Sequence, residues 1–410
     1  MSNRPFRFVH AGDFHLEMPP QGLAEVPDHL TDLFLEASYL AAERVFDTVL
    51  AEEADFLVLA GDLLSPRLTG PRGPLFLVEQ FNRLAEREIP VYWSGGRVDP
   101  PDAWPSAFDL PTNVHVFPRG RVGETVYGRD DERLARLIGI SREKRRSIRA
   151  SDFDPDPGGL FSIAVVHGSA EASVLQTRQI DYWAMGGIHQ RKTLFSSPQI
   201  AHYPGSPQGR RPQEDGSHGC TLVQVDPQGQ ARTSLVATDV VRWINERVVV
   251  EATADRETLE GQLRERLHTL TETMQQVDFL ISWTVVGEGP LLAQLRQGTL
   301  RAELLEVLRS EFGFGSPLAW SLTLESEPSA VLQPSWYDQE SIRGEFLREI
   351  RRYQTDSAEP LCLASFLSED HLAGTLATAA TDIAPSVRQR VLREAAMLGV
   401  DLLSGEENPS

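Results

Sequence analysis

The feature that most constrains the fold is a short apolar run that stops at glycine and a polar or charged residue. This pattern recurs in FRFVHAGDFH, DFLVLAGD, IPVYWSGG, FSIAVVHG and DYWAMGGIH. Apolar runs of this length, bounded by turn residues, are typical of buried strands. The helical spacing of Ala41, Val45 and Val49 predicts an amphipathic helix between the first two runs. The pattern therefore predicts an α/β domain whose functional residues lie in the loops after the strands.

Polar residues that can bind a metal stand at these strand ends: Asp13, His15, Asp62, His167 and His189. Carboxylate and imidazole together suit borderline divalent ions such as manganese, iron or zinc. A D-x-H turn, as in Asp13 and His15, can direct both side chains into one pocket. Taken singly, each residue is more simply explained as a hydrogen-bonded turn residue. Their recurrence at strand end after strand end favours a metal centre.

The pattern changes after about residue 240. A leucine stripe from Leu259 to Leu270, a strand-like VDFLISWTVV, a helical segment from Leu304 to Phe312 and an alternating strand from Leu318 to Leu324 follow one another. This order predicts a small separate α/β domain. Beyond Pro334 the apolar spacing is helical. The predicted domains are residues 1–240, 241–330 and 331–410.

Charge argues against binding of polyanions by bulk attraction. The chain has 39 basic and 59 acidic side chains and a formal net charge of -20. Two local basic clusters stand out, SREKRRSIR at Ser141 to Arg149 and GRR at Gly209 to Arg211. Each is compatible with phosphate contact or with a solvated loop.

The cysteines and the hydropathy pattern indicate a cytoplasmic protein. Cys220 and Cys362 lie far apart without a CxxC spacing, which argues against a disulfide framework or a structural zinc site. No apolar run approaches the roughly 20 residues that span a membrane, and no signal-like segment precedes the first strand. We therefore expect a cytoplasmic location and no membrane partner.

Taken in order, GDFH, GD, the glycine turn after IPVYW, VVHG, GGIHQRK and YPGSPQ resemble the motifs of calcineurin-like metallophosphoesterases. FVHAGDFHLEMPPQGL, DYWAMGGIHQRK and HYPGSPQGRR are most similar to the SbcD-type bacterial DNA repair exonucleases. The matching motifs run from Phe6 to about Asp226. The resemblance implies an α/β (α+β) fold. Residues 1–240 would form a β-sandwich of mixed sheets flanked by helices, residues 241–330 a small capping domain, and residues 331–410 a helical, partner-binding C-terminus.

The resemblance also implies a metal site for Mn²⁺, with one or two ions. Asp13, His15 and His189 match the ligands of one metal, Asp62 matches the carboxylate that bridges two metals, and His167 matches a ligand of the second metal. In this family two ions about 3.5 to 4 Å apart stabilise the attacking and leaving oxygens together.

Three positions depart from the family pattern. Gly96 replaces an asparagine ligand, Gly187 replaces a histidine ligand, and Arg97 replaces the histidine that protonates the leaving group. Asp62 and His167 alone are too few to hold the second ion tightly unless water or substrate completes its shell. Arginine stays protonated at neutral pH, so Arg97 cannot act as a general acid. Arg97 either clamps a phosphate or pairs with Asp99 in a structural role. Asp99 itself can alternatively be aligned with the final aspartate of the family's turn, if the alignment is shifted by one residue.

Two functions are compatible with these residues. The chain is either a manganese-dependent nuclease with one firmly held metal, or a catalytically impaired scaffold that holds an SbcC-like coiled-coil ATPase on DNA. A phosphatase for small molecules agrees less well with the YPGSPQ and GGIHQRK context. The family works as dimers, so a homodimer is a further expectation, although helical stripes are more often core than interface.

Overall fold

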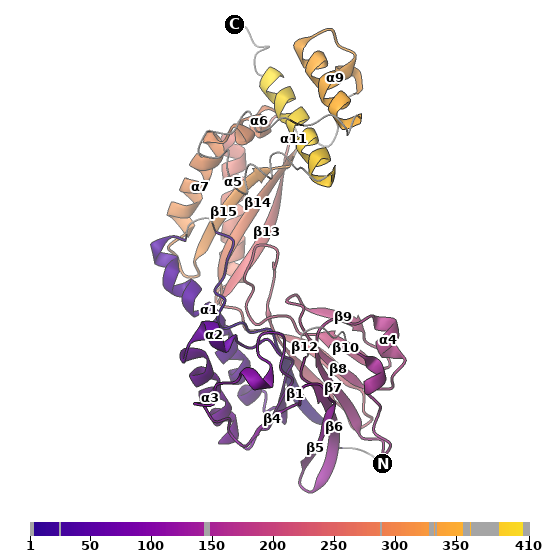
Figure 1. The fold of residues 1–410 in the computed structure, drawn as a ribbon. Helices are drawn as coiled ribbons and strands as arrows, with labels where there is room; N and C mark the ends of the chain where they lie inside the picture. The colour runs from indigo at the N-terminus through magenta and orange to yellow at the C-terminus, as the bar shows by residue number, and fades with distance from the viewer. Residues whose placement is uncertain are drawn as a thin grey trace. The chain divides into compact units, whose positions relative to one another are not determined.

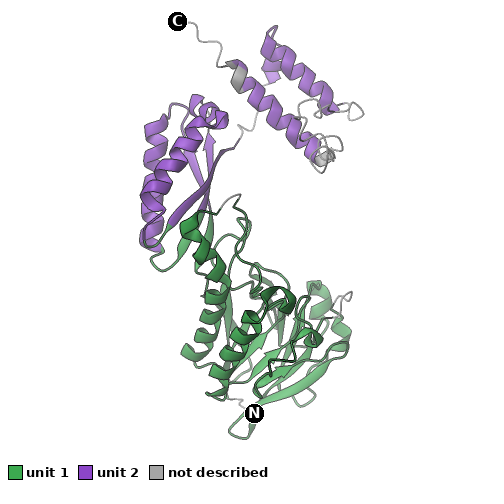
Figure 2. Cartoon of the chain, turned by 60° about the vertical axis from the view of Figure 1, so that its left-hand side comes forward, with its two compact units in different colours: residues 1–244, 274–280, 316–318 green, residues 245–273, 281–315, 319–410 purple. Residues whose placement is uncertain are grey.

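The computed structural model describes residues 4–23, 26–142, 148–287, 289–327, 332, 334–355, 361 and 385–404. The chain forms two compact units, shown in separate colours in Figure 2. Unit 1 comprises residues 1–244, 274–280 and 316–318, and unit 2 comprises residues 245–273, 281–315 and 319–410. The division into residues 1–240, 241–330 and 331–410 stays a prediction.

The first sheet of unit 1 contains the first three predicted strands (Figure 1). Its order is β12 (Ala231–Ala237), β11 (Gly219–Val225), β1 (Phe6–Ala11), β2 (Phe56–Leu59), β3 (Val91–Trp93) and β4 (Val114–Val116). Strands β1 to β4 are parallel, whereas β11 and β12 run antiparallel to their neighbours. Because β1, β2 and β3 end at one edge, the loops that follow them lie together.

The second sheet contains the other two predicted strands. Its order is β5 (Gly123–Arg129), β6 (Glu132–Ile140), β7 (Phe161–His167), β8 (Tyr182–Gly186), β10 (Ile200–Tyr203) and β9 (Lys192–Phe195). Strands β6, β7, β8 and β10 are parallel. Val166 pairs with Met185 and His167 with Gly186, so the loops after β7 and β8 also emerge side by side.

Three apolar clusters hold the two sheets and their helices in layers. Aromatic side chains fill the space between the sheets, with Phe8 and Phe56 stacked and the Tyr182 ring edge-on to Phe8. A second cluster packs α1 (Asp28–Ala51) and α3 (Arg72–Ala85) on the outer face of the first sheet, and a third packs α4 (Ala172–Gln176) on the outer face of the second. The short helices are α2 (Pro66–Thr69), η1 (Pro101–Ala103) and η2 (Ala150–Asp152).

Unit 2 is built from the later predicted elements. Its sheet, whose residues 241–244 and 278–280 are counted in unit 1, has the order β13 (Val241–Val250), β14 (Asp278–Gly287) and β15 (Ala319–Ser326). The helices are α5 (Arg256–Thr273), α6 (Pro290–Gln297), α7 (Thr299–Phe312), α8 (Pro334–Tyr337), α9 (Ile342–Thr355) and α11 (Pro385–Ser404). The predicted leucine stripe of α5 is buried, as its i, i+4 spacing requires. Helices α9 and α11 share a small core that includes Leu347, Leu392 and Ala396.

The predicted mixed α/β fold is confirmed: a two-sheet sandwich flanked by helices, a further α/β segment and C-terminal helices. Within the described residues, no helix is both long enough and apolar enough to cross a membrane. Cys220 is buried and unoxidised, whereas Cys362 and the cluster residues 143–147 lie outside the described residues.

Candidate metal centre

The loops after β1 and β2 are joined by backbone hydrogen bonds at the edge where the parallel strands end. The Asp13 N–H donates to the Gly61 carbonyl at 2.8 Å, and the His15 N–H donates to the Asp62 carbonyl at 3.1 Å. Asp13, His15 and Asp62 adopt left-handed φ angles of 53°, 46° and 52°. Such angles cost free energy in non-glycine residues, and they concentrate at functional sites. Here they turn three predicted ligands inward.

All five predicted ligands come together at this edge. Potential ligand atoms of Asp13, His15 and His189 lie within 4.8 Å of one another, and so do those of Asp13, Asp62 and His167. Asp13 is therefore shared by both clusters. The Asp62 Oδ2 atom lies 3.3 Å from His167 Nε2 and 3.9 Å from His15 Nε2, so it faces a histidine of each cluster.

The three histidines are oriented in the same way. Each ring presents Nδ1 to an acceptor: His167 to the Ala60 carbonyl at 2.8 Å, His189 to Glu214 Oε1 at 3.0 Å, and His15 to Glu17 Oε1 at 3.4 Å. An acceptor at Nδ1 favours the tautomer with its proton on that nitrogen. When the ring is neutral, Nε2 then carries the lone pair, an arrangement common to metal-binding histidines.

Two buried atoms at the centre have no hydrogen-bond partner in the described part of the chain. They are Asp13 Oδ1 and His15 Nε2. Burying such atoms unsatisfied costs about 1–3 kcal/mol each. Both are ligand atoms for a borderline divalent cation. The unsatisfied atoms and the mixed nitrogen and oxygen donors thus fit a divalent metal.

The two carboxylates of the second cluster, Asp13 and Asp62, differ in electrostatics. Burial raises the pKa of Asp13 above its ordinary value, against the opposing charge of His167. Burial acts to raise the pKa of Asp62, but the hydrogen bond and charge of His167 hold it well below its usual range. Burial acts to lower the pKa of His167, and the Asp62 carboxylate outweighs it and raises that pKa to about 9. Without a metal, Asp62 and His167 therefore behave as an ion pair.

The GGRVD turn is organised by Asp99. Its carboxylate accepts the N–H groups of Asp62 and Leu63 at 2.9 Å and that of Gly96 at 2.6 Å. Burial, reinforced by the negative charge of Asp62, raises the pKa of Asp99 to about 7. Arg97 is exposed, and among the described residues the Asp99 carboxylate has backbone N–H groups and not Arg97 as its partners. Asp99 thus fixes the loops after β2 and β3 through their backbones.

Gly96 and Gly187, which are predicted to replace ligand residues, lie close to the second cluster. A Cβ atom on Gly96 would overlap the backbone nitrogen and Oδ1 of Asp62. Gly187 has a φ of 100°, and a Cβ there would lie 3.3 Å from His167 Nε2. The Gly187 N–H donates instead to Asp13 Oδ2 at 2.7 Å. At both glycines a backbone N–H donates to a carboxylate, that of Gly96 to Asp99 and that of Gly187 to Asp13.

Two residues at the centre were missed from sequence, and a third, Arg210, was named only as part of the GRR basic cluster. Glu17 and Glu214 accept from histidines, and Arg210 lies against His189. Glu17 follows His15 by two residues in the same loop, which is a usable signal. Glu214 gives no such signal, because its contact with His189 depends on the fold. In the GRR cluster, Arg210 is buried, unlike the exposed Arg211.

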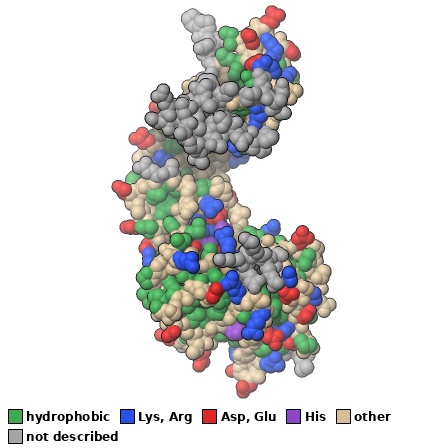
Figure 3. Space-filling model, viewed as in Figure 1, with side chains coloured by type: hydrophobic (Ala, Val, Ile, Leu, Met, Phe, Trp, Pro, Cys, Tyr) green, Lys and Arg blue, Asp and Glu red, His purple; other side chains and the backbone are tan. Residues whose placement is uncertain are grey.

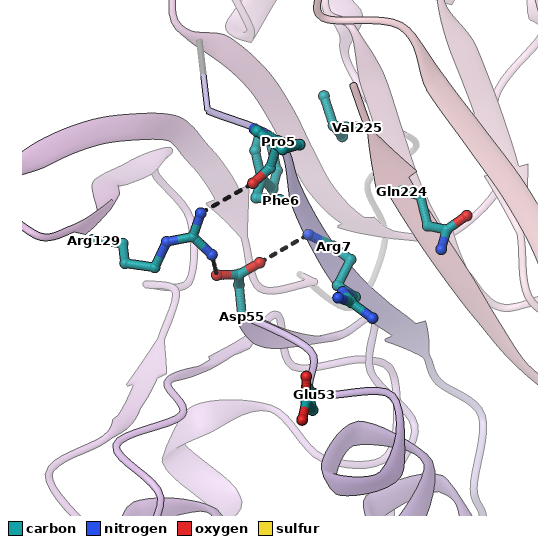
Figure 4. Close-up of a pocket in the computed structure, with 8 residues that line it drawn as sticks. All are labelled: Pro5, Phe6, Arg7, Glu53, Asp55, Arg129, Gln224 and Val225. Atoms are coloured by element: carbon teal, nitrogen blue, oxygen red, sulfur yellow. Dashed lines mark hydrogen bonds and ion pairs between the residues drawn. The ribbon is translucent and has the colours of Figure 1, made fainter. Parts of the chain in front are cut away.

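A second concavity lies at the amino end of β1, away from these residues (Figure 4). Three of its charged residues, Arg7, Asp55 and Arg129, already have partners. Asp55 accepts from the Arg7 N–H at 2.9 Å and pairs with Arg129 at 2.7 Å, and Arg129 also donates to the Pro5 carbonyl at 3.0 Å. This concavity therefore lacks the unsatisfied ligand atoms that mark the candidate centre.

Curated proteins share sequence similarity with most of the chain, although no protein-family model matches it. The chain is 28% identical over 335 residues to the uncharacterized metallophosphoesterase YhaO of Bacillus subtilis, covering 78% of this chain and 81% of that protein. It is 24% identical over 296 residues to the DNA double-strand break repair protein Mre11 of Methanopyrus kandleri, covering 64% of this chain and 62% of that protein.

Solved structures show a more distant likeness. A dimetal phosphatase from Danio rerio is 12% identical, with a TM-score of 0.34, over 56% of this chain and 98% of that chain. Vacuolar Protein Sorting 29 from Cryptosporidium parvum is 15% identical, with a TM-score of 0.25, over 57% of this chain and 97% of that chain. The sequence relatives support similarity to metallophosphoesterases at the level of the superfamily.

Proposed function

We propose that this chain is a manganese-dependent phosphodiesterase that acts on DNA. The sequence relatives support the broader part of this proposal, a metallophosphoesterase of the calcineurin-like superfamily. One observation carries the metal dependence. The unsatisfied Asp13 Oδ1 and His15 Nε2 atoms lie in a cluster with His189, whose Nε2 lone pair is also directed away from its carboxylate partner. Five predicted ligands of the two donor types that manganese accepts meet at one edge.

In this proposal Asp13, His15 and His189 hold the first metal, and Asp62 faces it from the second cluster. Divalent ions bound here would withdraw electron density from a phosphoryl oxygen and from the attacking water. Other residues of the chain hold these ligands in their orientation. Glu17 and Glu214 fix two histidine rings, and Asp99 holds the loop that carries Asp62.

The second cluster is weaker than in the family pattern. It has Asp13, Asp62 and His167, and neither Gly96 nor Gly187 adds a side chain. Arg97, exposed on the adjacent turn, can donate two parallel hydrogen bonds to a phosphate and so replace part of the missing positive charge. We therefore assign one firmly held ion and one weak ion that substrate oxygens help to bind.

DNA is favoured as the substrate by two findings. The motifs around His189 and the YPGSPQ segment resemble those of DNA repair exonucleases, and one relative is named as a double-strand break repair protein. With a net charge of -20, much of the basic surface for DNA would come from a partner, for which an SbcC-like ATPase is the proposed candidate. The C-terminal helices α9 and α11 are its proposed contact, and a homodimer is the proposed assembly.

A scaffold function is the alternative, and the glycines favour it. Because a Cβ at Gly96 would overlap Asp62, the turn has no room for a ligand side chain without rearrangement. Loss of two ligands and of a histidine acid removes groups that typically contribute about a hundredfold each to rate. A chain that binds metal and DNA without cleavage would fit this observation.

The deciding experiment measures hydrolysis of bis(4-nitrophenyl) phosphate and of a labelled DNA duplex with Mn²⁺. Wild type is compared with His167→Ala and with the exposed control His29→Ala. We expect turnover of both substrates that falls at least about a hundredfold in His167→Ala and is unchanged in His29→Ala. Metal uptake without turnover by the wild type would favour the scaffold. Turnover of the ester but never of DNA would remove DNA as the substrate.

A further inference from the structure

The loop of residues 206–218 brings the carboxylate of Glu214 to the ring of His189. Glu214 Oε1 lies 3.0 Å from His189 Nδ1, and Glu214 Oε2 accepts the backbone N–H of Arg210 at 2.8 Å. The side chain of Glu214 is only 10% exposed, so water contributes little to its orientation. Because the Arg210 N–H belongs to the same loop, the position of the carboxylate depends on what holds the loop itself.

Trp243, near the start of β13, holds this loop at two points. Its indole Nε1–H donates to the Gly209 carbonyl at 2.9 Å, and its own carbonyl accepts the Gly216 N–H at 2.9 Å. Trp243 is 1% exposed, so a shift of Gly209 would leave a buried N–H group unsatisfied, which costs free energy. Glu214 lies between these two points along the chain, so Trp243 limits how far its backbone can move.

Gln208 joins the same loop to the residues just before Trp243. Its side-chain oxygen accepts the N–H groups of Val240 and Val241 at 3.0 and 3.3 Å. Its Nε2 atom donates to the Val241 carbonyl at 2.5 Å and to the Gly209 carbonyl at 2.8 Å. Gln208 is 1% exposed, and a buried polar group whose hydrogen bonds are all made rigidifies its surroundings. The loop and the start of β13 are therefore fixed to each other.

Resting on the proposed metal-dependent function, we infer that Trp243 and Gln208 are positioning residues for the His189 side of the metal centre. They act through Glu214: because the loop is held at its base, the carboxylate stays at Nδ1 and the ring keeps its place in the first ligand cluster. Groups that orient a metal-binding histidine typically contribute about 10- to 100-fold to metal affinity. Strand β13 continues into unit 2 at residue 245, so the strand that joins the units also supports the centre.

The test measures Mn²⁺ affinity by calorimetry. Trp243→Phe removes the N–H donor and keeps an aromatic ring, and we expect it to bind the tighter Mn²⁺ ion about tenfold more weakly than wild type. Trp283→Phe is the matched control, because Trp283 is also 1% exposed and its Nε1–H donates to Ser321 Oγ at 3.0 Å within unit 2. This control loses a buried hydrogen bond of the same kind and should bind Mn²⁺ as wild type does.

Two further measurements show whether Trp243 acts through Glu214. In a double-mutant cycle, Trp243→Phe should weaken Mn²⁺ binding by less than about twofold once Glu214→Ala has removed the carboxylate. Nitrogen-15 NMR of the neutral His189 ring in the metal-free protein should show the proton on Nδ1 in wild type, and a larger fraction on Nε2 in Trp243→Phe. Circular dichroism establishes that each variant is folded, and Gln208→Met carries the test if Trp243→Phe is not.

The outcomes separate this inference from the proposed function. If wild type binds Mn²⁺ and the folded Trp243→Phe and Gln208→Met variants bind it equally well, the inference is overturned and the metal centre stands. Independent effects of Trp243→Phe and Glu214→Ala, or an equal loss of affinity in Trp283→Phe, would also overturn it. A wild-type protein that takes up no Mn²⁺ overturns the proposed function and this inference with it.

Discussion

Asp13 is the residue on which the candidate centre most depends, because its carboxylate lies in both ligand clusters. Its Oδ2 atom is held by the Gly187 N–H, and its Oδ1 atom is buried with no hydrogen-bond partner among the described residues. One oxygen is thus fixed by the fold and the other is left for a ligand. The left-handed backbone of Asp13 is the local cost of this orientation.

At this scale we predict that Gly96→Ala damages the second cluster. The new methyl group would overlap Asp62, and the variant should lose the weaker Mn²⁺ ion while keeping the tighter one. Calorimetric titration with Mn²⁺ measures this. Gly261→Ala, whose methyl group would meet no atom within 4 Å, is the matched control. Two ions bound normally by Gly96→Ala would contradict the assignment of this turn to the centre.

At the scale of elements, two sheets meet through aromatic side chains that also align the ligand loops. Phe56 in β2 contacts Phe8 at 4.9 Å and Tyr127 at 4.8 Å between ring centroids. The next residues of β2 lead directly to Asp62. Sheet packing and ligand position are thus coupled through one short strand.

We expect Phe56→Ala to destabilise unit 1 by about 3–5 kcal/mol, since it leaves a cavity among buried aromatic rings. Urea unfolding followed by intrinsic fluorescence gives the free energy of unfolding. Leu235→Ala in the exposed part of β12 should change it by less than about 0.5 kcal/mol. Similar losses for the two variants would argue against a tightly packed sandwich.

A buried histidine between the same sheets predicts acid sensitivity. His202 Nδ1 contacts Thr193 Oγ1 and Nε2 contacts Thr221 Oγ1, both at 2.9 Å. Burial, with a smaller contribution from the charge of Arg191, lowers the pKa of His202 from 6.5 to about 3. Between these two values the unfolded chain binds the extra proton, so stability is complete above pH 6.5 and falls as the pH approaches 3.

The measurement compares wild type with His202→Gln. Between pH 7 and pH 4.5, the wild type should lose up to about 3 kcal/mol more free energy of unfolding than the variant. His29→Gln, at an exposed position, should follow the wild type. If the free energy of unfolding depends on pH in the same way in wild type and His202→Gln, this histidine has the same pKa in the folded and unfolded states, which would contradict the prediction.

Strands and helices that bury a continuous apolar run or stripe can be predicted from the sequence. Elements whose side chains are only partly buried are harder to predict, because they lack such a pattern. Strand β5 alternates between exposed and half-buried residues apart from Tyr127, so its sequence resembles a loop. At the centre, the ligands follow strands and are visible in the sequence. Glu214 and Arg210 reach His189 only because a loop folds back, so local pattern does not reveal them.

At the scale of the whole molecule, charge limits what the chain does alone. The face shown in Figure 3 carries acidic and basic side chains interspersed over its described part, and the net charge of the chain is -20. Few phosphates can then be neutralised at once, and the salt dependence of DNA binding should be shallow.

We predict that raising salt from about 50 to 200 mM weakens duplex DNA binding by about tenfold or less, as expected for one or two phosphate contacts. Fluorescence anisotropy with the metal-loaded chain measures this. A loss of about a thousandfold would instead reveal an extended basic surface and would remove the need for a partner to supply one.

The most direct test of the central claim is the stoichiometry of Mn²⁺ in wild type, His167→Ala and Asp13→Ala, measured by calorimetry and elemental analysis. The shared carboxylate predicts one tight and one weak ion in wild type, loss of the weak ion alone in His167→Ala, and loss of both in Asp13→Ala. Asp47→Ala, at an exposed aspartate of α1, should bind as wild type does. Two ions retained by Asp13→Ala would contradict the account.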